Sequence, residues 1–164
     1  MDSELYSKIE LQKLSQFLVK AKLVTYASGN LNYAVDPALA GSHQLEYFDK
    51  DLHYRDIYYG GMHFIGMETV SRIEEPIWGM CYYGGVLPDS DDKQVAGMPS
   101  FLKAALCEVP LEAPYRGPNS FKMGDYIYEN EIHGDILSFH GTEFIKFQGH
   151  VIYNLRYSGG LVNS

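Results

Sequence analysis

Residues 64–85, FIGMETVSRIEEPIWGMCYYGG, decide the fold, because a related stretch returns at residues 139–160 as FHGTEFIKFQGHVIYNLRYSGG. A shift of 75 residues superimposes the two stretches without a gap, and the agreement extends outward to cover 52–87 and 127–162. The identical residues gather in a Phe-x-Gly-x-Glu motif and in the closing Gly-Gly. The sequence therefore predicts a tandem duplication of one structural unit.

Each unit is predicted to be a helix followed by an antiparallel meander. The first helix, over 7–22, begins at the capping box Ser7-x-x-Glu10, and the second, over 100–109, ends before Pro110. Both helices contain a Phe-Leu-x-x-Ala motif. The strand patterns, bounded by turn-forming residues, lie at 44–48, 52–59, 63–73 and 77–87 and then at 125–132, 135–139, 142–147 and 150–158.

These elements predict an α+β fold in one domain over 1–164, built of two repeats at about 7–87 and 100–162. One repeat alone cannot bury the apolar faces of both its helix and its sheet well. Side by side, the two repeats form a larger antiparallel sheet with the helices packed on one face. We therefore expect a single core shared by both repeats.

Composition excludes several classes of protein. The chain has 164 residues, of which 46% are hydrophobic and 14% aromatic, so it is a folded globule. Its net charge of −8 has the wrong sign for direct nucleic-acid binding. An acidic start and the lack of a long apolar stretch predict no signal peptide and no membrane contact, and hence a cytoplasmic location. Cys81 and Cys107 are expected to be reduced core thiols, and no residue spacing predicts a metal or another cofactor.

The duplicated Phe-x-Gly-x-Glu motif places a carboxylate on an otherwise apolar sheet face. If each hairpin turn is centred as the sequence suggests, Glu68 lies opposite Tyr82, and Glu143 lies opposite Tyr157. A glycine two residues from each glutamate clears space beside it. A carboxylate in this position needs a phenol, a cation or a ligand as its partner.

Three interpretations of these pairs stay open. In the first, both glutamates line an acidic pocket with aromatic walls that binds a cationic or hydrogen-bond-donating small molecule. In the second, each glutamate is a structural residue tied to its tyrosine or to an arginine, for which Arg55, Arg72 and Arg156 are the candidates. In the third, the two carboxylates work as the acid and base of a small hydrolase.

Other residues extend the pocket interpretation. Trp78 and Tyr82 share a strand face, and Asp56 alternates with tyrosines on a neighbouring strand, where it forms either a pocket wall or part of a solvated face. The rigid Pro114-Tyr115-Arg116-Gly117-Pro118 segment presents Arg116 to an anion, or closes onto Glu68 or Glu143. We expect the polar segment 26–42 to lie near the pocket mouth.

The sequence resembles an uncharacterised bacterial domain family that occurs alone and fused to helix-turn-helix regulators of the xenobiotic-response type. The shared motifs run over nearly the whole chain and include Leu45-x-Tyr47, Tyr54-x-Asp56, Phe64-x-Gly66-x-Glu68, Pro76-x-Trp78-x-Met80-x-Tyr82-Tyr83-Gly84, Pro114-Tyr115-Arg116-Gly117-Pro118 and Phe139-x-Gly141-x-Glu143. Fusion to such regulators implies a sensing role. This chain departs from that arrangement, because its single N-terminal helix runs directly into a loop and strands. The helix-plus-sheet plan is also similar to that of tandem cystatin-like inhibitors and of duplicated effector-binding domains, both of which bind other molecules.

The function expected from the sequence is therefore a non-enzymatic module that binds or senses a small molecule in a cleft between the repeats. The ligand-binding residues are expected to be Glu68, Glu143, Tyr82, Tyr157, Trp78, Arg116 and Asp56. The first alternative is a protein-interaction or inhibitor module that uses a tyrosine-rich sheet face, and the lesser one is the hydrolase.

Overall fold

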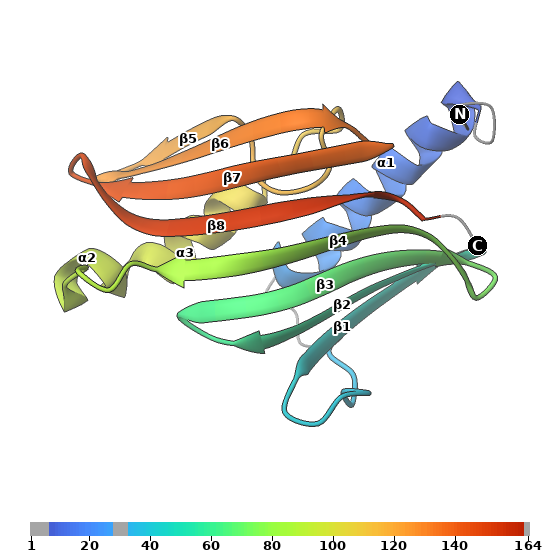
Figure 1. The fold of residues 1–164 in the computed structure, drawn as a ribbon, viewed down its shortest axis with the longest axis horizontal. Coiled ribbons are helices and arrows are strands. Elements are labelled where there is room, and N and C mark those ends of the chain that lie inside the picture. The colour runs from blue at the N-terminus through green and yellow to red at the C-terminus, as the bar shows by residue number, and fades with distance from the viewer. Residues whose placement is uncertain (1–6, 28–32, 163–164) are drawn as a thin grey trace.

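The computed structural model describes residues 7–27 and 33–162. Within them, eight antiparallel strands form a sheet of order β1-β2-β3-β4-β8-β7-β6-β5, so that two four-stranded meanders meet at β4 and β8 (Figure 1). The strands are β1 (His43–Asp49), β2 (Leu52–Gly60), β3 (His63–Arg72), β4 (Glu75–Val86), β5 (Ser120–Met123), β6 (Tyr126–Asp135), β7 (Ser138–Phe147) and β8 (His150–Leu161). The predicted α+β fold with two meanders is confirmed.

The helices lie on one face of the sheet, which leaves the opposite face bare among the described residues (Figure 1). They are α1 (Lys8–Lys22), the short π-helix η1 (Leu23–Ala27), α2 (Asp92–Ala96) and α3 (Met98–Leu106). The predicted capping box starts α1, since the Ser7 hydroxyl accepts from the Glu10 amide and the Glu10 carboxylate accepts from the Ser7 amide. α1 contacts β1 and β2, and α3 contacts β5 and β6. No helix of the described segments is long and apolar enough to span a bilayer.

A pseudo-twofold axis passes between β4 and β8. Tyr82 pairs directly with Tyr157, the residue 75 positions further along, which is its own counterpart in the second repeat. Trp78 pairs with Leu161, and Val86 pairs with Tyr153, so the two ends of this strand pair are also related by exchange of the repeats. The junction between the meanders is therefore the place where equivalent side chains of the two repeats meet.

The second meander differs from its predicted boundaries. β7 is one strand over Ser138–Phe147, where the sequence predicted separate strands at 135–139 and 142–147, and β5 was not predicted. Gly141 suggested a turn, but it lies within β7, and a Cβ there would come within 2.3 Å of the Tyr157 ring. The glycine lets a ring cross the strand, and it does not turn the chain.

The predicted register of the β3–β4 hairpin is wrong by two residues. Glu68 pairs with Met80, and Tyr82 pairs with Gly66. The predicted pairing of Glu143 with Tyr157 is wrong by the same two residues, since Glu143 pairs with Leu155 and Tyr157 with Gly141. The turn lies at Ile73 and Glu74, both with positive φ, and the register shifts between Val70 and Ser71, just before the turn. A two-residue turn of this kind matches the twist of the strands, and it moves the hairpin centre toward the N-terminus. Because the error is an even number of residues, every side chain keeps its predicted face.

The duplication also contains a one-residue gap that the sequence comparison missed. Asp56 pairs with Glu68 in the first repeat, whereas the partner of Glu143 is Asn130. The β6–β7 turn is one residue longer than the β2–β3 turn, so the counterpart of Asp56 is Asn130 and not Glu131. This correction matters for the site described below.

The core lies between the helices and one face of the sheet and draws on both repeats. Its fully buried side chains include Leu18, Tyr54, Trp78, Phe101 and Ile145. The two cysteines do not belong to it. Cys81 and Cys107 are both exposed, contrary to the prediction of core thiols, and no disulfide joins them.

Candidate functional site

Each of the two predicted glutamates is completely buried and paired with a cation. Glu143 on β7 receives two hydrogen bonds from Arg116, from Nε to Oε2 at 3.0 Å and from Nη2 to Oε1 at 2.6 Å. Tyr128 donates to Oε2 at 2.6 Å, and Tyr153 donates to Oε1 at 2.8 Å. Burial and the nearby Glu143 charge raise the pKa of both phenols, which therefore stay protonated donors. This carboxylate is fully satisfied by the protein itself.

Glu68 on β3 uses a different cation. Its Oε2 is paired with the ammonium of Lys22, which comes from the end of α1. Burial lowers the pKa of Lys22, and the adjacent Glu68 opposes that shift. Lys22 follows Leu18 by one helical turn, so it lies on the buried stripe of α1 and reaches the sheet. Of the arginines suggested from the sequence, Arg116 pairs with Glu143. The others, Arg55, Arg72 and Arg156, pair with neither Glu68 nor Glu143.

A second pair of equivalent interactions, two tyrosine hydrogen bonds, joins β4 to β2 and β8 to β6. The Tyr82 hydroxyl donates to Asp56 Oδ1 at 2.6 Å, and the Tyr157 hydroxyl donates to Asn130 Oδ1 at 2.8 Å. Each tyrosine ring crosses the intervening strand at a glycine, and at Gly66 a Cβ would lie 2.3 Å from the Tyr82 hydroxyl oxygen. The glycine near each glutamate therefore clears space as predicted, but a tyrosine ring fills that space where it crosses the strand.

Asp56 is the unusual member of this set. It is 4% exposed, and burial followed by the charge of Glu68 raises its pKa from 3.8 to about 7. Asn130 performs the same acceptor role toward Tyr157 without any charge. A neutral amide oxygen is therefore enough to accept the hydrogen bond from the tyrosine. The ionisable carboxylate of Asp56 is not required for this contact.

A pocket of about 320 Å³ opens beside Asp56 on the helix-bearing face, and we call it the inter-repeat pocket. It is lined by His43, Asp56, Tyr58, Gly60, Gly61, Phe64, Tyr82, Leu102, Leu106 and Arg116. The strands of the first repeat supply its floor, and α3 with the following connector supplies its wall. The predicted cleft between the repeats thus corresponds to a pocket whose polar residues include Asp56, Tyr82 and Arg116.

The remaining predicted ligand-binding residues lie elsewhere. Glu68 and Glu143 are buried behind the pocket in their ion pairs and do not line it. Trp78 is fully buried and stacks on Phe139, with ring centroids 5.8 Å apart, so it is a core residue. Tyr157 is 3% exposed and belongs to the core, and it borders, together with Tyr82, a groove on the opposite face of the sheet. The structure therefore brings together three of the seven residues at one open site.

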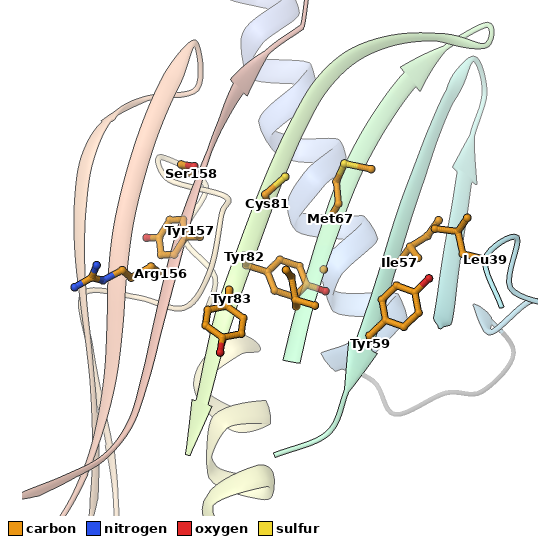
Figure 2. A pocket seen from close by; sticks show the side chains of 12 residues that line it. Leu39, Ile57, Tyr59, Met67, Cys81, Tyr82, Tyr83, Arg156, Tyr157 and Ser158 are labelled. Carbon is orange, nitrogen blue, oxygen red and sulfur yellow. The ribbon is translucent and has the colours of Figure 1, made fainter. Parts of the chain in front are cut away.

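That second groove, the bare-face groove, has a volume of about 520 Å³ (Figure 2). Side chains of β2, β3, β4 and β8 line it, and most are apolar or aromatic. Ile65 is 54% exposed and Tyr83 is 61% exposed, while Arg156 stands at the β8 edge of the groove. The predicted segment 26–42 contributes Leu39 to this groove, and its residues 28–32 lie outside the described part of the chain.

Sequence reasoning missed three of the polar residues that complete these networks. Lys22 could have been found, since it is the one charged residue on the apolar stripe of its helix. Asn130 was hidden by the gap in the duplication, which placed Glu131 opposite Asp56 in the comparison. Tyr128 would have become visible with the same correction, because it is the counterpart of Tyr54.

Residues 56–162 match the family described as "Domain of unknown function (DUF5680)". The chain belongs to this family. The DUF5680 match begins at Asp56 and includes Arg116, Glu143 and the whole second repeat, whereas α1 and β1 precede it. No curated protein and no solved structure matches the chain. Within the described residues, no group of three His, Cys, Asp or Glu side chains is arranged to hold a metal ion.

Proposed function

We propose that this DUF5680 protein is a binding module whose inter-repeat pocket takes a small molecule with a cationic or hydrogen-bond-donating group on an apolar body. The observation that carries the proposal is the ionisable Asp56 where the fold requires only a neutral acceptor. Among the described residues, one hydrogen bond reaches its carboxylate, from Tyr82 to Oδ1. The other oxygen is available to a ligand in the pocket.

The charges around the pocket favour a cation. Glu143 neutralises Arg116, and Glu68 neutralises Lys22, so an ionised Asp56 is the unbalanced charge of the cluster. Phe64, Leu102 and Leu106 supply an apolar wall opposite this carboxylate. A mostly apolar lining with a few placed polar groups, here Asp56, Tyr82 and Arg116, is the usual form of a small-molecule site.

The resemblance to bacterial domains fused to xenobiotic-response-type regulators supports a sensing role for such binding. A ligand that bridges β2 and α3 would contact both repeats at once, because Asp56 belongs to the first and Leu106 to the second. Binding would then be communicated to both halves of the molecule. The hydrolase interpretation is not proposed, since both of its carboxylates are held in ion pairs outside the pocket.

A calorimetric titration of primary amines and amidines tests the proposal, with Asp56→Asn as the key variant. This variant should fold, because Asn130 already accepts from Tyr157 in the same geometry. We expect it to weaken binding by tenfold or more. With wild-type protein, affinity should fall up to tenfold for each pH unit below about 7, as Asp56 takes up a proton. Asp89→Asn, in an exposed loop, serves as the control. Ligands that bind Asp56→Asn as tightly as wild type would contradict the assignment.

The bare-face groove supports a second candidate function, a protein-interaction module. An exposed apolar patch of this kind is typical of an interaction surface. Arg156 is exposed and forms no ion pair within the described residues, so a matching protein partner presents apolar side chains next to a carboxylate. A photo-crosslinking residue at position 83 should capture one partner, and Arg156→Glu should abolish the adduct. Capture of a second copy of this chain, or an adduct insensitive to Arg156→Glu, would count against this function.

A further inference from the structure

The second repeat fills part of its own apolar face with an aromatic ring from the connector after α3. Tyr115 stacks on Phe139 with ring centroids 3.6 Å apart and planes 4° from parallel. Tyr115 is 1% exposed, so the contact is closed from solvent. Parallel stacking of this kind adds to the free energy gained from burial of the ring.

Phe64 is the counterpart of Phe139 in the first repeat, 75 residues earlier. The two phenylalanines also have equivalent neighbours across the axis. The ring centroids of Phe64 and Tyr153 are 6.4 Å apart, and those of Phe139 and Trp78 are 5.8 Å apart. Within the described residues, the ring contacts of Phe64 are edge-on with Tyr82 or tilted with Tyr153, and none is a parallel stack. Phe64 instead lines the inter-repeat pocket.

The surroundings of Phe64 have room for a ring. A further hollow of about 220 Å³ adjoins the inter-repeat pocket and shares Phe64, Leu102 and Leu106 with it. Its lining is almost entirely apolar and includes Met98. The carboxylate of Asp56 lies in the wall of the pocket proper. A flat apolar group over Phe64 would therefore have a hydrogen-bond acceptor within the same cavity.

We infer that the ligand of the inter-repeat pocket is an aromatic amine, whose ring stacks on Phe64 as Tyr115 stacks on Phe139 and whose ammonium group binds Asp56. This inference rests on the proposed function and narrows it to one chemical class. The internal symmetry supplies the argument, because the same protein surface already holds an aromatic ring at the equivalent position. The charge of Asp56, absent from its counterpart Asn130, adds the cationic requirement.

Tyramine is a suitable probe, since it combines the ring of a tyrosine side chain with an ammonium group. We expect the protein to bind tyramine roughly three- to tenfold more tightly than 2-cyclohexylethylamine, which has the same charge but no aromatic face. Phe64→Leu should remove this difference, and Phe48→Leu, on an exposed side chain, should keep it. In NMR spectra of the wild-type complex, the ring protons of tyramine should shift upfield through stacking, a measurement that needs no variant.

The outcomes separate this inference from the proposed function. Equal binding of both amines, lost in Asp56→Asn, would overturn the aromatic assignment and leave the binding function standing. Failure of all amines and amidines to bind in an Asp56-dependent manner would overturn both. Tyramine binding without an upfield shift of its ring protons would also contradict stacking on Phe64.

Discussion

At the scale of single residues, Asp56 and Asn130 have nearly the same shape and hydrogen-bonding role but differ in charge. Both accept a hydrogen bond from a tyrosine of the central strand pair. A buried carboxylate without its own cation is costly, and the cost appears as a raised pKa. The first repeat therefore carries a less stable group where the second repeat carries a neutral one, which is the pattern expected when one copy of a duplication has acquired a function.

The raised pKa of Asp56 predicts a specific dependence of stability on pH. The folded protein holds this proton up to a pH of about 7, whereas the unfolded chain releases it near 3.8. The contribution of Asp56 is thus fully present below 3.8 and is lost as the pH rises to 7. Between pH 5 and 7, the unfolding free energy of wild type should fall relative to Asp56→Asn by about 1.4 kcal/mol per unit.

Urea denaturation of both proteins at pH 5, 6, 7 and 8 would measure this difference. All other titrating groups are common to the two proteins and largely cancel when their unfolding free energies are subtracted. The difference should become constant above about pH 8. A difference that does not change between pH 5 and 7 would show that the Asp56 carboxylate titrates near its ordinary pKa.

At the scale of elements, the sequence was sufficient to predict α1, α3 and the strands of the first meander, because period-two patterns and caps are local signals, whereas α2 and η1 were not predicted. The α1 start at Ser7 and the faces of Glu68 and Tyr82 were predicted correctly. The second meander was harder, since Gly141 in a strand looks like a turn until the Tyr157 ring that crosses it is known. For the ion pairs, the sequence left open whether Arg116 closes onto Glu68 or Glu143, because the choice depends on how α1 and the connector containing Arg116 lie over the sheet.

The different cations of the two repeats lead to a prediction about α1. In the motif shared by the helices, Lys22 corresponds to Leu106, so the first repeat takes its cation from the helix and the second takes Arg116 from the connector. Lys22→Met would leave Glu68 buried without its cation and should cost about 3–5 kcal/mol of unfolding free energy. The double variant Lys22→Met with Glu68→Met should be more stable than Lys22→Met alone.

Chemical denaturation of the single and double variants would test this coupling. Lys20→Met is the matched control, because Lys20 lies on the same helix and pairs with Asp49 at the surface. That pair is largely solvated, so its loss should change stability by less than about 1 kcal/mol. Additive effects of Lys22→Met and Glu68→Met would contradict a direct interaction between the two side chains.

At the scale of the whole molecule, the two repeats are joined through the sheet, the core and the inter-repeat pocket. Their strands pair through β4 and β8, Trp78 of the first repeat stacks on Phe139 of the second, and Phe64 contacts Tyr153. The inter-repeat pocket likewise takes residues from both. A ligand in that pocket would therefore stabilise the molecule as a unit, rather than one half of it.

This sharing predicts that the protein unfolds in one cooperative transition. Val70 on β3 and Ile145 on β7 occupy equivalent positions, and both are completely buried. Ile145→Ala should lower the unfolding free energy by about 2–5 kcal/mol, and Val70→Ala should lower it by less, because a smaller side chain is removed. In each variant, fluorescence of Trp78, the only tryptophan, and the circular dichroism of the whole sheet should report the same midpoint. Val151→Ala, on an exposed side chain of the second repeat, should leave the midpoint nearly unchanged. If Ile145→Ala instead divides the dichroism signal into two steps, with Trp78 following the later one, the repeats fold independently and a ligand could act on one alone.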